Sequence, residues 1–182
     1  MSGALTIRVA VESDLPALRT LMTLSIDHGQ AAVLTPEQVA ASRAVMGLDT
    51  QLVRDGTYFV VEEEGMPVGC GGWSRRATLY GGDHSTALRD PALLDPVTDA
   101  ARIRAMYTHP GHVRRGIGRM ILDHCERAAG AEGFAAVELM GTAGGVPLYV
   151  ACGYMPVERA DAEVDGVVVP LTRMRKPLRA MA

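Results

Sequence analysis

Residues 103–129 read IRAMYTHPGHVRRGIGRMILDHCERAA, and the fold depends on this stretch. Apolar residues alternate over 103–107, which predicts a strand, and the His-Pro-Gly sequence at 109–111 ends it. After Gly116 the apolar residues recur at steps of three and four, which predicts a helix. The predicted buried stripe of that helix is Ile117, Met120, Ile121, His124, Cys125 and Ala128. The stretch is therefore expected to form a strand, a glycine turn and a helix.

The start of this predicted helix has the features of an anion site. Free N–H groups of a first helical turn point out of the helix together with the positive end of its dipole. Gly116 and Gly118 have no Cβ, so a bulky anion can approach, and Arg114, Arg115 and Arg119 add charged donors. The residues fit neither the P-loop nor the dinucleotide fingerprint. We interpret the site as a pyrophosphate cradle; a tight turn with solvated arginines is the alternative.

The same residues carry a family resemblance. Met106-Tyr107-Thr108-His109-Pro110, followed by the basic Gly-x-Gly turn, resembles the acetyl-CoA-binding core of the GNAT superfamily of N-acetyltransferases. The family usually has Gln or Arg three residues before the first glycine, where this chain has Val113, and Thr142 stands where many relatives have asparagine. The resemblance implies acetyl-CoA as cosubstrate and these binding residues: Met106, Tyr107, Thr108, Val113, Arg114, Arg115, Gly116, Ile117, Gly118, Arg119 and Thr142.

A second motif is PLYVACGY at 147–154. It is similar to the family's Phe-Tyr-x-x-x-Gly-Phe/Tyr segment, in which the tyrosine hydroxyl lies near the thioester sulfur. Transfer of an acyl group from a thioester to an amine expels a thiolate, and a positioned phenol can supply its proton. The resemblance therefore makes Tyr149 the candidate general acid. From the residues alone, an aromatic ring packed in the core is an equal alternative.

Size and charge restrict the class of protein. A chain of 182 residues is most simply one domain, 1–182, and its net charge of −3 comes from mixed acidic and basic residues. This balance argues against a nucleic-acid partner. No long apolar span or charged leader is visible, and residues 1–4 lead directly into a strand pattern. We expect a cytoplasmic protein with no membrane partner.

Cysteine usage gives no sign of a metal or disulfide site. Cys70, Cys125 and Cys152 are odd in number and widely spaced, so we expect three small core residues and no metal. The acidic run Glu62–Glu64 is interpreted as a solvated hairpin tip. Gly69, Gly71 and Gly72 indicate a bulge or a close approach in the strand that follows.

The rest of the chain completes an α/β (α+β) pattern, the GNAT acyltransferase fold. A strand, a helix and a second strand in this order predict a parallel pair at the centre of a mixed six- to seven-stranded sheet flanked by helices. Thr35 and Gln38 predict a capping box, and Pro170 predicts that the last strand lies at an edge or bulge. The other expected segments are strands at 5–9, 57–63, 66–73, 134–140, 154–158 and 167–174, helices at 14–27, 36–47 and 144–152, a turn at 49–54, and a loop at 75–100 with a short helix at 91–94.

The acceptor and the general base are less defined. We expect a primary amine on a small molecule or peptide, selected by the first two helices and by the loop at 75–100; a homodimer is left open. Loop charges that could contact it are Arg75, Arg76, Arg89, Asp83, Asp90, Asp95 and Asp99, and alanine at Arg75 or Asp83 is expected to change kcat/KM for the amine. Four base candidates stay open: Glu138, His28, His84 and Asp83. The alternative function is a non-catalytic acyl-CoA-binding sensor or assembly module on the same fold.

Overall fold

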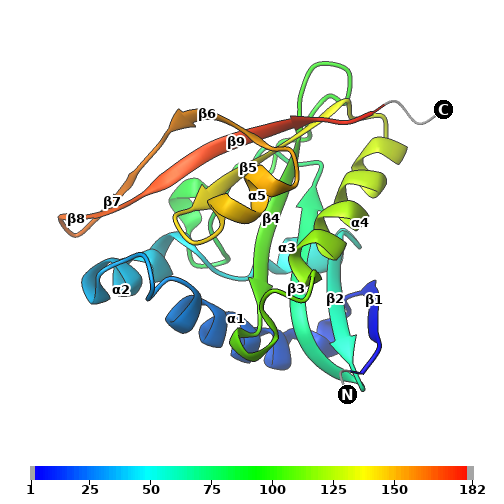
Figure 1. Cartoon of the computed structure of the whole chain (residues 1–182). Coiled ribbons are helices and arrows are strands. Elements are labelled where there is room, and N and C mark those ends of the chain that lie inside the picture. Colours follow the sequence, from blue (N-terminus) through cyan, green and yellow to red (C-terminus); the bar gives the residue numbers. More distant parts are fainter. Residues whose placement is uncertain (1–2, 180–182) are drawn as a thin grey trace.

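The computed structural model describes residues 3–179, which form a mixed sheet with helices on both faces (Figure 1). Met1 and Ser2, which contributed to the expectation of no leader, lie outside the described residues. The predicted fold class is confirmed, because the seven strands have the order β1-β2-β3-β4-β5-β9-β6, with β4 and β5 parallel. The strands are β1 (Leu5–Val9), β2 (Tyr58–Glu63), β3 (Met66–Ser74), β4 (Ala101–Thr108), β5 (Ala136–Thr142), β6 (Met155–Arg159) and β9 (Leu171–Pro177).

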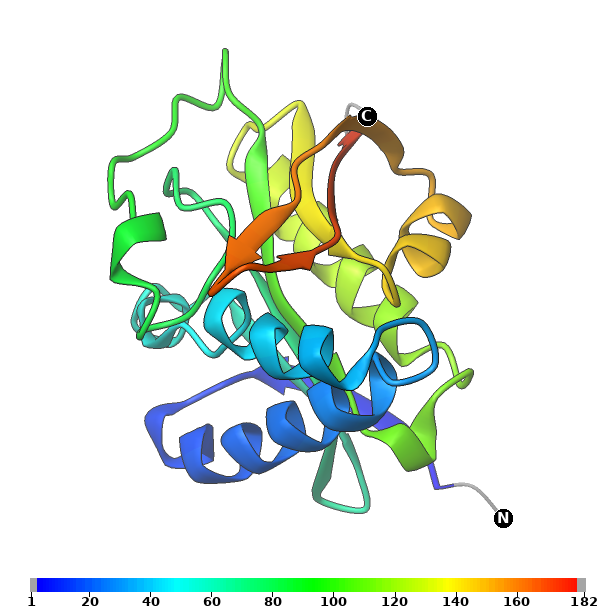
Figure 2. The same cartoon turned by 90° about the vertical axis from the view of Figure 1, so that its left-hand side faces the viewer.

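The helices divide between the two faces of the sheet. Figure 2 shows α1 and α2 in front of the sheet, with α4 behind it. The α-helices are α1 (Leu15–Gly29), α2 (Pro36–Val45), α3 (Thr50–Arg54), α4 (Ile117–Ala131) and α5 (Val146–Ala151). Short 3-10 turns cover Glu12–Asp14, Thr86–Leu88 and Pro110–His112, and a separate hairpin pairs β7 (Ala162–Val164) with β8 (Val167–Val169).

Alternation along β2 divides the core into two clusters. Phe59 and Val61 pack with α4, whereas Tyr58 and Val60 pack with α1 and α3 on the opposite face. Side chains of a strand point to opposite faces in turn, so one central strand supports both layers. Cys70 lies in the second cluster, and Cys125 and Cys152 lie in the first, as small buried thiols without a disulfide.

Deleting a side chain from the α1 layer should be costly. Leu18 is fully buried under α1, so Leu18→Ala should lower the free energy of unfolding by about 2–5 kcal/mol through lost burial and a residual cavity. Denaturant unfolding measures this change. The control is Leu93→Ala, whose side chain is 69% exposed and should change stability by no more than about 0.5 kcal/mol. Equal losses in both variants would contradict this account of the core.

The parallel strands β4 and β5 separate soon after they begin. Their pairing covers only Ala101 with Val137 and Arg102 with Glu138, after which the strands diverge. The two strands therefore splay, and within the described residues the later part of β4 has no paired strand on its β5 side. Because α4 connects the two strands, its N-terminus lies where β4 ends, close to the opening.

A bulge bends β4 at the opening. Ala105 has a φ of +51°, and the β3–β4 register shifts between Cys70 and Gly72, so the extra residue lies in β4 and not in the strand 66–73 that carries the glycines. The Tyr58 hydroxyl donates to the Ala105 carbonyl at 2.7 Å and fixes the bend. Gly71 is required for close approach, since a Cβ there would lie 2.4 Å from Met106 Sδ.

The capping box at the start of α2 forms as predicted. The Thr35 hydroxyl accepts from the Gln38 N–H and the Gln38 side chain accepts from the Thr35 N–H, which confirms the capping box. Gln38 also donates through Nε2 to the Val168 carbonyl at 2.9 Å, so this side chain attaches the β7–β8 hairpin to α2. The hairpin turns at Asp165 and Gly166, both with positive φ.

Two sequence predictions about the later chain are wrong. Residues 91–94 are extended and not helical. The Ala77 N–H donates to the Ala92 carbonyl and the Leu94 N–H donates to the Arg75 carbonyl, and these bonds hold the segment against the start of the loop. The last strand, β9, lies between β5 and β6 and is not at an edge. Pro170, which has no N–H, instead separates β8 from β9.

Candidate functional site

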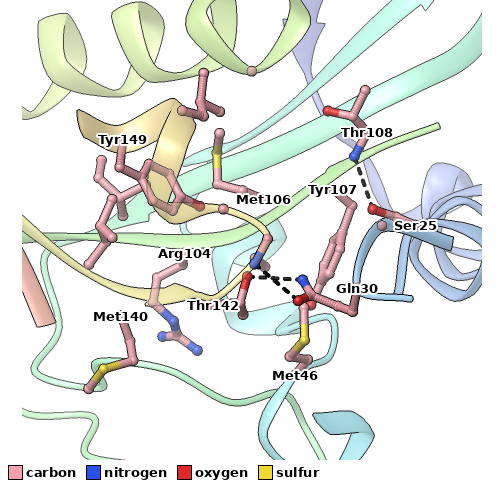
Figure 3. A pocket seen from close by; sticks show the side chains of 18 of the residues that line it. Ser25, Gln30, Met46, Arg104, Met106, Tyr107, Thr108, Met140, Thr142 and Tyr149 are labelled. Atoms are coloured by element: carbon pink, nitrogen blue, oxygen red, sulfur yellow. Dashed lines mark hydrogen bonds between the residues drawn. The ribbon is translucent and has the colours of Figure 1, made fainter. Parts of the chain in front are cut away.

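The splay between β4 and β5 opens into a cavity of about 630 Å³. Figure 3 shows α4 above it, Tyr149 beside it, and Arg104, Met46 and Met140 below. We call the two parts the α4 end and the α2 end. The α4 end is lined by Val113, Arg114, Gly116, Ile117, Gly118 and Arg119, and the α2 end by Val45, Met46, Leu79, Tyr80, Gly81, Arg104, Met140 and Leu171.

The α4 end has the geometry of an anion site. Gly116 is the N-cap of α4 with a φ of +80°, and the first helical bond runs from the Met120 N–H to the Gly116 carbonyl. The N–H groups before Met120 therefore lack a partner within the helix. Arg114 and Arg119 also line the cavity. Gly118 permits close packing, because a Cβ there would lie 2.5 Å from Leu148 Cδ2 on α5.

Arg115 does not join this lining, contrary to the sequence interpretation. Its guanidinium pairs with both oxygens of Glu63, at 2.8 and 2.7 Å, and His112 lies 3.0 Å from the same carboxylate. The Arg115 hydrogen bonds hold the pKa of Glu63 at about 2, below its usual value. Glu62 likewise pairs with Arg8, so the interpretation of the acidic run as a merely solvated tip is wrong for both residues. Through these contacts Glu63 fixes the position of the loop that precedes α4.

The free side of β4 is partly occupied. Met106, Tyr107 and Thr108 all line the cavity, but the Thr108 N–H donates to Ser25 Oγ at 3.3 Å. The Tyr107 side chain is buried, and its hydroxyl accepts from the Gly47 N–H at 2.9 Å and donates to the Gly47 carbonyl at 3.2 Å. These contacts attach β4 to α1 and to the segment after α2.

Thr142 lines the cavity through a contact that the sequence did not indicate. Its hydroxyl accepts from Gln30 Nε2 at 2.9 Å, and Gln30 Oε1 accepts from the Gly144 N–H at 3.3 Å (Figure 3). Gln30 is buried at the C-terminal end of α1, 112 residues away in sequence. No local pattern marks this glutamine, because its partners depend on the tertiary fold.

Tyr149 on α5 is positioned for chemistry in the cavity. Its ring packs edge-on against Tyr154 with 5.9 Å between centroids, and its hydroxyl points into the opening (Figure 3). Within residues 3–179 that hydroxyl makes no hydrogen bond. Burial raises the pKa of Tyr149 to about 12, and the nearby Cys152 contributes to the shift. The phenol therefore keeps its proton at neutral pH.

The four base candidates do not line the cavity. Glu138 pairs with Arg102 and Arg175, and Asp83 accepts from the N–H and hydroxyl of Thr50. One ring nitrogen of each histidine contacts a backbone carbonyl: His28 Nδ1 lies 2.9 Å from that of Leu24, and His84 Nε2 lies 2.7 Å from that of Arg43.

The α2 end combines apolar walls with a buried arginine. Arg104 has a 2% exposed side chain and donates to Asp49 Oδ2 at 3.1 Å and to the Gly81 carbonyl at 2.8 Å. It thereby holds the start of the long loop against β4. Sequence reasoning missed Arg104, although its alternation with Ile103 placed it on the face opposite the apolar core.

Comparison with known proteins places this geometry in a family. The family model described as Acetyltransferase (GNAT) domain matches residues 54–156, more than half of the chain. The chain belongs to this family. No curated protein matches it.

Solved structures share the GNAT fold over nearly the whole chain. The GCN5-related N-acetyltransferase from Rhodopseudomonas palustris has a TM-score of 0.70 at 20% identity, covering 98% of each chain. YncA from Salmonella typhimurium, solved with acetyl-CoA, has a TM-score of 0.64 at 21% identity, covering 99% of this chain and 97% of that one. The ribosomal-protein-S18-alanine N-acetyltransferase from Escherichia coli has a TM-score of 0.60 at 18% identity, covering 98% and 96%.

No helix in the described part of the chain is long and apolar enough to cross a membrane. Among residues 3–179, no three His, Cys, Asp or Glu side chains gather where they could hold a metal ion.

Proposed function

We propose that this protein transfers the acetyl group of acetyl-CoA to a primary amine of a small molecule or peptide. The observation that carries the proposal is that the N-terminus of α4 and the Tyr149 hydroxyl open into the same cavity. A helix end stabilises a phosphate group, and a buried phenol can donate a proton to a leaving thiolate. One cavity would therefore bind the cosubstrate and supply the proton. The acetyl-CoA bound to YncA supports this choice of cosubstrate.

The cofactor would lie along the α4 end. Its pyrophosphate would accept from the free N–H groups of Ile117, Gly118 and Arg119, with Arg114 adding charge. Its pantetheine arm would follow the free side of β4 past Met106 and Tyr107, where backbone groups can pair with amides. The acceptor amine would approach from the α2 end. This arrangement leaves the thioester near Tyr149.

Tyr149 is proposed as the general acid. The amine nitrogen attacks the thioester carbonyl carbon, the bond from carbon to sulfur breaks, and the thiolate takes the phenolic proton. The amine releases one proton, so the phenol is restored and the products are an amide and free CoA. The pKa of about 12 exceeds the value of about 8.5 for an ordinary thiol, so the hydroxyl acts first as a hydrogen-bond donor to the developing thiolate.

A binding measurement and an activity measurement together test this function. Calorimetry should detect acetyl-CoA binding, and a panel of amines should include substrates that release CoA in proportion to amide formed. Binding without turnover for every amine would favour the acyl-CoA sensor over the enzyme. Absence of binding would remove the proposed site altogether.

The structure changes our expectation for the long loop. Arg75 pairs with Glu132 at 2.6 Å and lies over the Trp73 ring, and Asp83 pairs with Thr50, so neither side chain reaches the cavity. Only Leu79, Tyr80 and Gly81 of this loop line it. Arg75→Ala and Asp83→Ala should therefore leave kcat/KM for the amine within about twofold of the parent, because exposed ion pairs contribute little. Steady-state kinetics would check this, and a large change in either variant would restore the charged loop as an acceptor determinant.

A further inference from the structure

A row of arginines borders the α2 end on the sheet face opposite α4. Met140 and Leu171 line the cavity, and Arg173 of β9, which does not itself line it, lies beside Met140 in the strand register. The next row places Arg102 and Arg175 on either side of Glu138. The sheet face that forms the wall of the α2 end therefore continues directly into a basic surface.

Two carboxylates, Glu138 and Glu158, face the three arginines of this surface and do not fully balance their charge. Glu138 has an 8% exposed side chain and is already bonded to Arg102 at 2.9 Å and Arg175 at 3.0 Å. Arg173 Nη1 lies 4.0 Å from the same carboxylate, beyond hydrogen-bond reach. Three guanidinium groups thus surround one buried carboxylate, and Arg173 is the group that Glu138 does not satisfy.

Arg173 is also unusual in its hydrogen bonding. Its Nε lies 3.3 Å from Glu158 Oε1, close enough for attraction, but the pair lacks the alignment of a hydrogen bond. Among residues 3–179, Arg173 Nε is the one buried side-chain nitrogen or oxygen that has no hydrogen-bond partner. Buried donors in folded proteins nearly always have a partner, so this one calls for an explanation. A ligand anion is one that the surrounding charge favours.

The cavity itself disfavours an acceptor with a second cation. No Asp or Glu side chain lines it within the described residues, whereas Arg104, Arg114 and Arg119 do. The walls of the α2 end are otherwise mostly apolar, with Met46, Tyr80 and Leu171 packed in one cluster. The second cation of a polyamine would have no carboxylate to pair with there, whereas an apolar group could be buried against these walls.

We propose that the acceptor is a primary amine that carries a carboxylate on an apolar body, and that Arg173 binds this carboxylate at the rim of the α2 end. The inference rests on the proposed function and specifies its substrate class. A guanidinium binds a carboxylate through charge-assisted hydrogen bonds, and among the described residues Arg173 donates none, although Glu158 lies 3.3 Å from its Nε. Arg104 also lines the α2 end, but its charge is paired with Asp49 and its hydrogen bonds hold the loop.

Matched acceptors test the carboxylate. L-phenylalanine, L-phenylalaninamide and 2-phenylethylamine share an amine and an apolar ring, and only the first has a carboxylate. We expect kcat/KM for phenylalanine to exceed that for the other two by about 10- to 100-fold, the range of one charged hydrogen bond. Turnover that is equal for all three, or highest for spermidine, would overturn the inference while leaving the acetyltransferase function intact. Failure of acetyl-CoA to bind would instead refute the function.

Variants test the residue. Arg173→Gln should lower kcat/KM for phenylalanine by about 10- to 100-fold, mainly through KM, and leave the value for 2-phenylethylamine and the KM for acetyl-CoA unchanged. Arg173→Lys should recover part of the loss because it keeps the charge. The control is Arg159→Gln on the adjacent β6, whose 72% exposed side chain pairs with Asp161; neither residue lines the cavity. An equal loss for both acceptors in Arg173→Gln would reduce Arg173 to a structural role.

Discussion

Tyr149→Phe should lower kcat by about 10²- to 10⁴-fold while the Kd for acetyl-CoA stays within about threefold of the parent. The variant keeps the ring that packs against Tyr154 and removes only a hydroxyl that has no partner among the described residues. The lost rate therefore reports on proton donation and not on packing. Pre-steady-state kinetics would establish that chemistry limits turnover, and calorimetry would give the Kd.

A neighbouring tyrosine supplies the matched control. The Tyr154 hydroxyl donates to Glu126 Oε1 at 3.0 Å, and Tyr154 does not line the cavity. Tyr154→Phe should therefore leave kcat unchanged within about twofold, although it removes a buried hydrogen bond and lowers stability by about 1 kcal/mol. An unchanged kcat in Tyr149→Phe, or equal losses in the two variants, would mean that Tyr149 only packs in the core and is not the general acid.

The pKa of Tyr149 gives this prediction a pH signature. Because burial raises that pKa to about 12, the phenol stays protonated up to about pH 10, where an ordinary tyrosine is half ionised. The ratio of parent to Tyr149→Phe turnover should accordingly stay constant between about pH 7 and about pH 10. A ratio that collapses across this interval would mean that the phenol ionises below about pH 10 and that burial does not raise its pKa to about 12.

Gly118→Glu should raise the Kd for acetyl-CoA by at least about 100-fold, a loss of about 2.7 kcal/mol. The new carboxylate would lie in the first turn of α4, where it would occupy the positive helix end and repel the pyrophosphate. Calorimetry measures the change. However, any Cβ at this position meets Leu148 on α5, so packing must be separated from charge.

A Leu148→Ala background provides that separation. Gly118→Ala and Gly118→Glu in this background add the same Cβ where the leucine no longer blocks it, and they differ in the negative charge. We expect the alanine variant to bind acetyl-CoA within about tenfold of the background and the glutamate variant to lose binding. If the two bind equally well and both are folded by circular dichroism, the pyrophosphate does not lie at this helix end.

The sequence predicted those features that depend on neighbouring residues. The β4-turn-α4 unit follows from apolar periods and from glycine at 116, and the Thr35 capping box follows from spacing alone. The parallel pair follows from the order strand, helix, strand. These signals are local, so the central architecture and most of the cavity lining at β4, α4 and α5 could be expected.

The missed features depend on partners distant in the chain. The sequence predicts that Arg115 belongs to the anion cradle. In the fold it pairs instead with Glu63, which lies 52 residues earlier in the chain. Gln30 and Arg104 have no local signature, since their partners come from other elements. The extended segment at 91–94 forms because the start of the same loop supplies a backbone partner, which outweighs the weak helical signal of four residues.

The contact of Gln38 with the β7–β8 hairpin has a consequence for how substrates enter. The hairpin is not part of the main sheet, and it packs on α2 through a small apolar cluster that includes Val169 and Leu171. Local opening costs less free energy where few buried contacts must be broken, so we expect the contact between α2 and the hairpin to open more readily than the β4–α4–β5 unit. An acceptor could then reach the α2 end through a side entrance without disturbing a cofactor already held at α4. The order of binding would be set by the unequal stability of the two ends of one cavity.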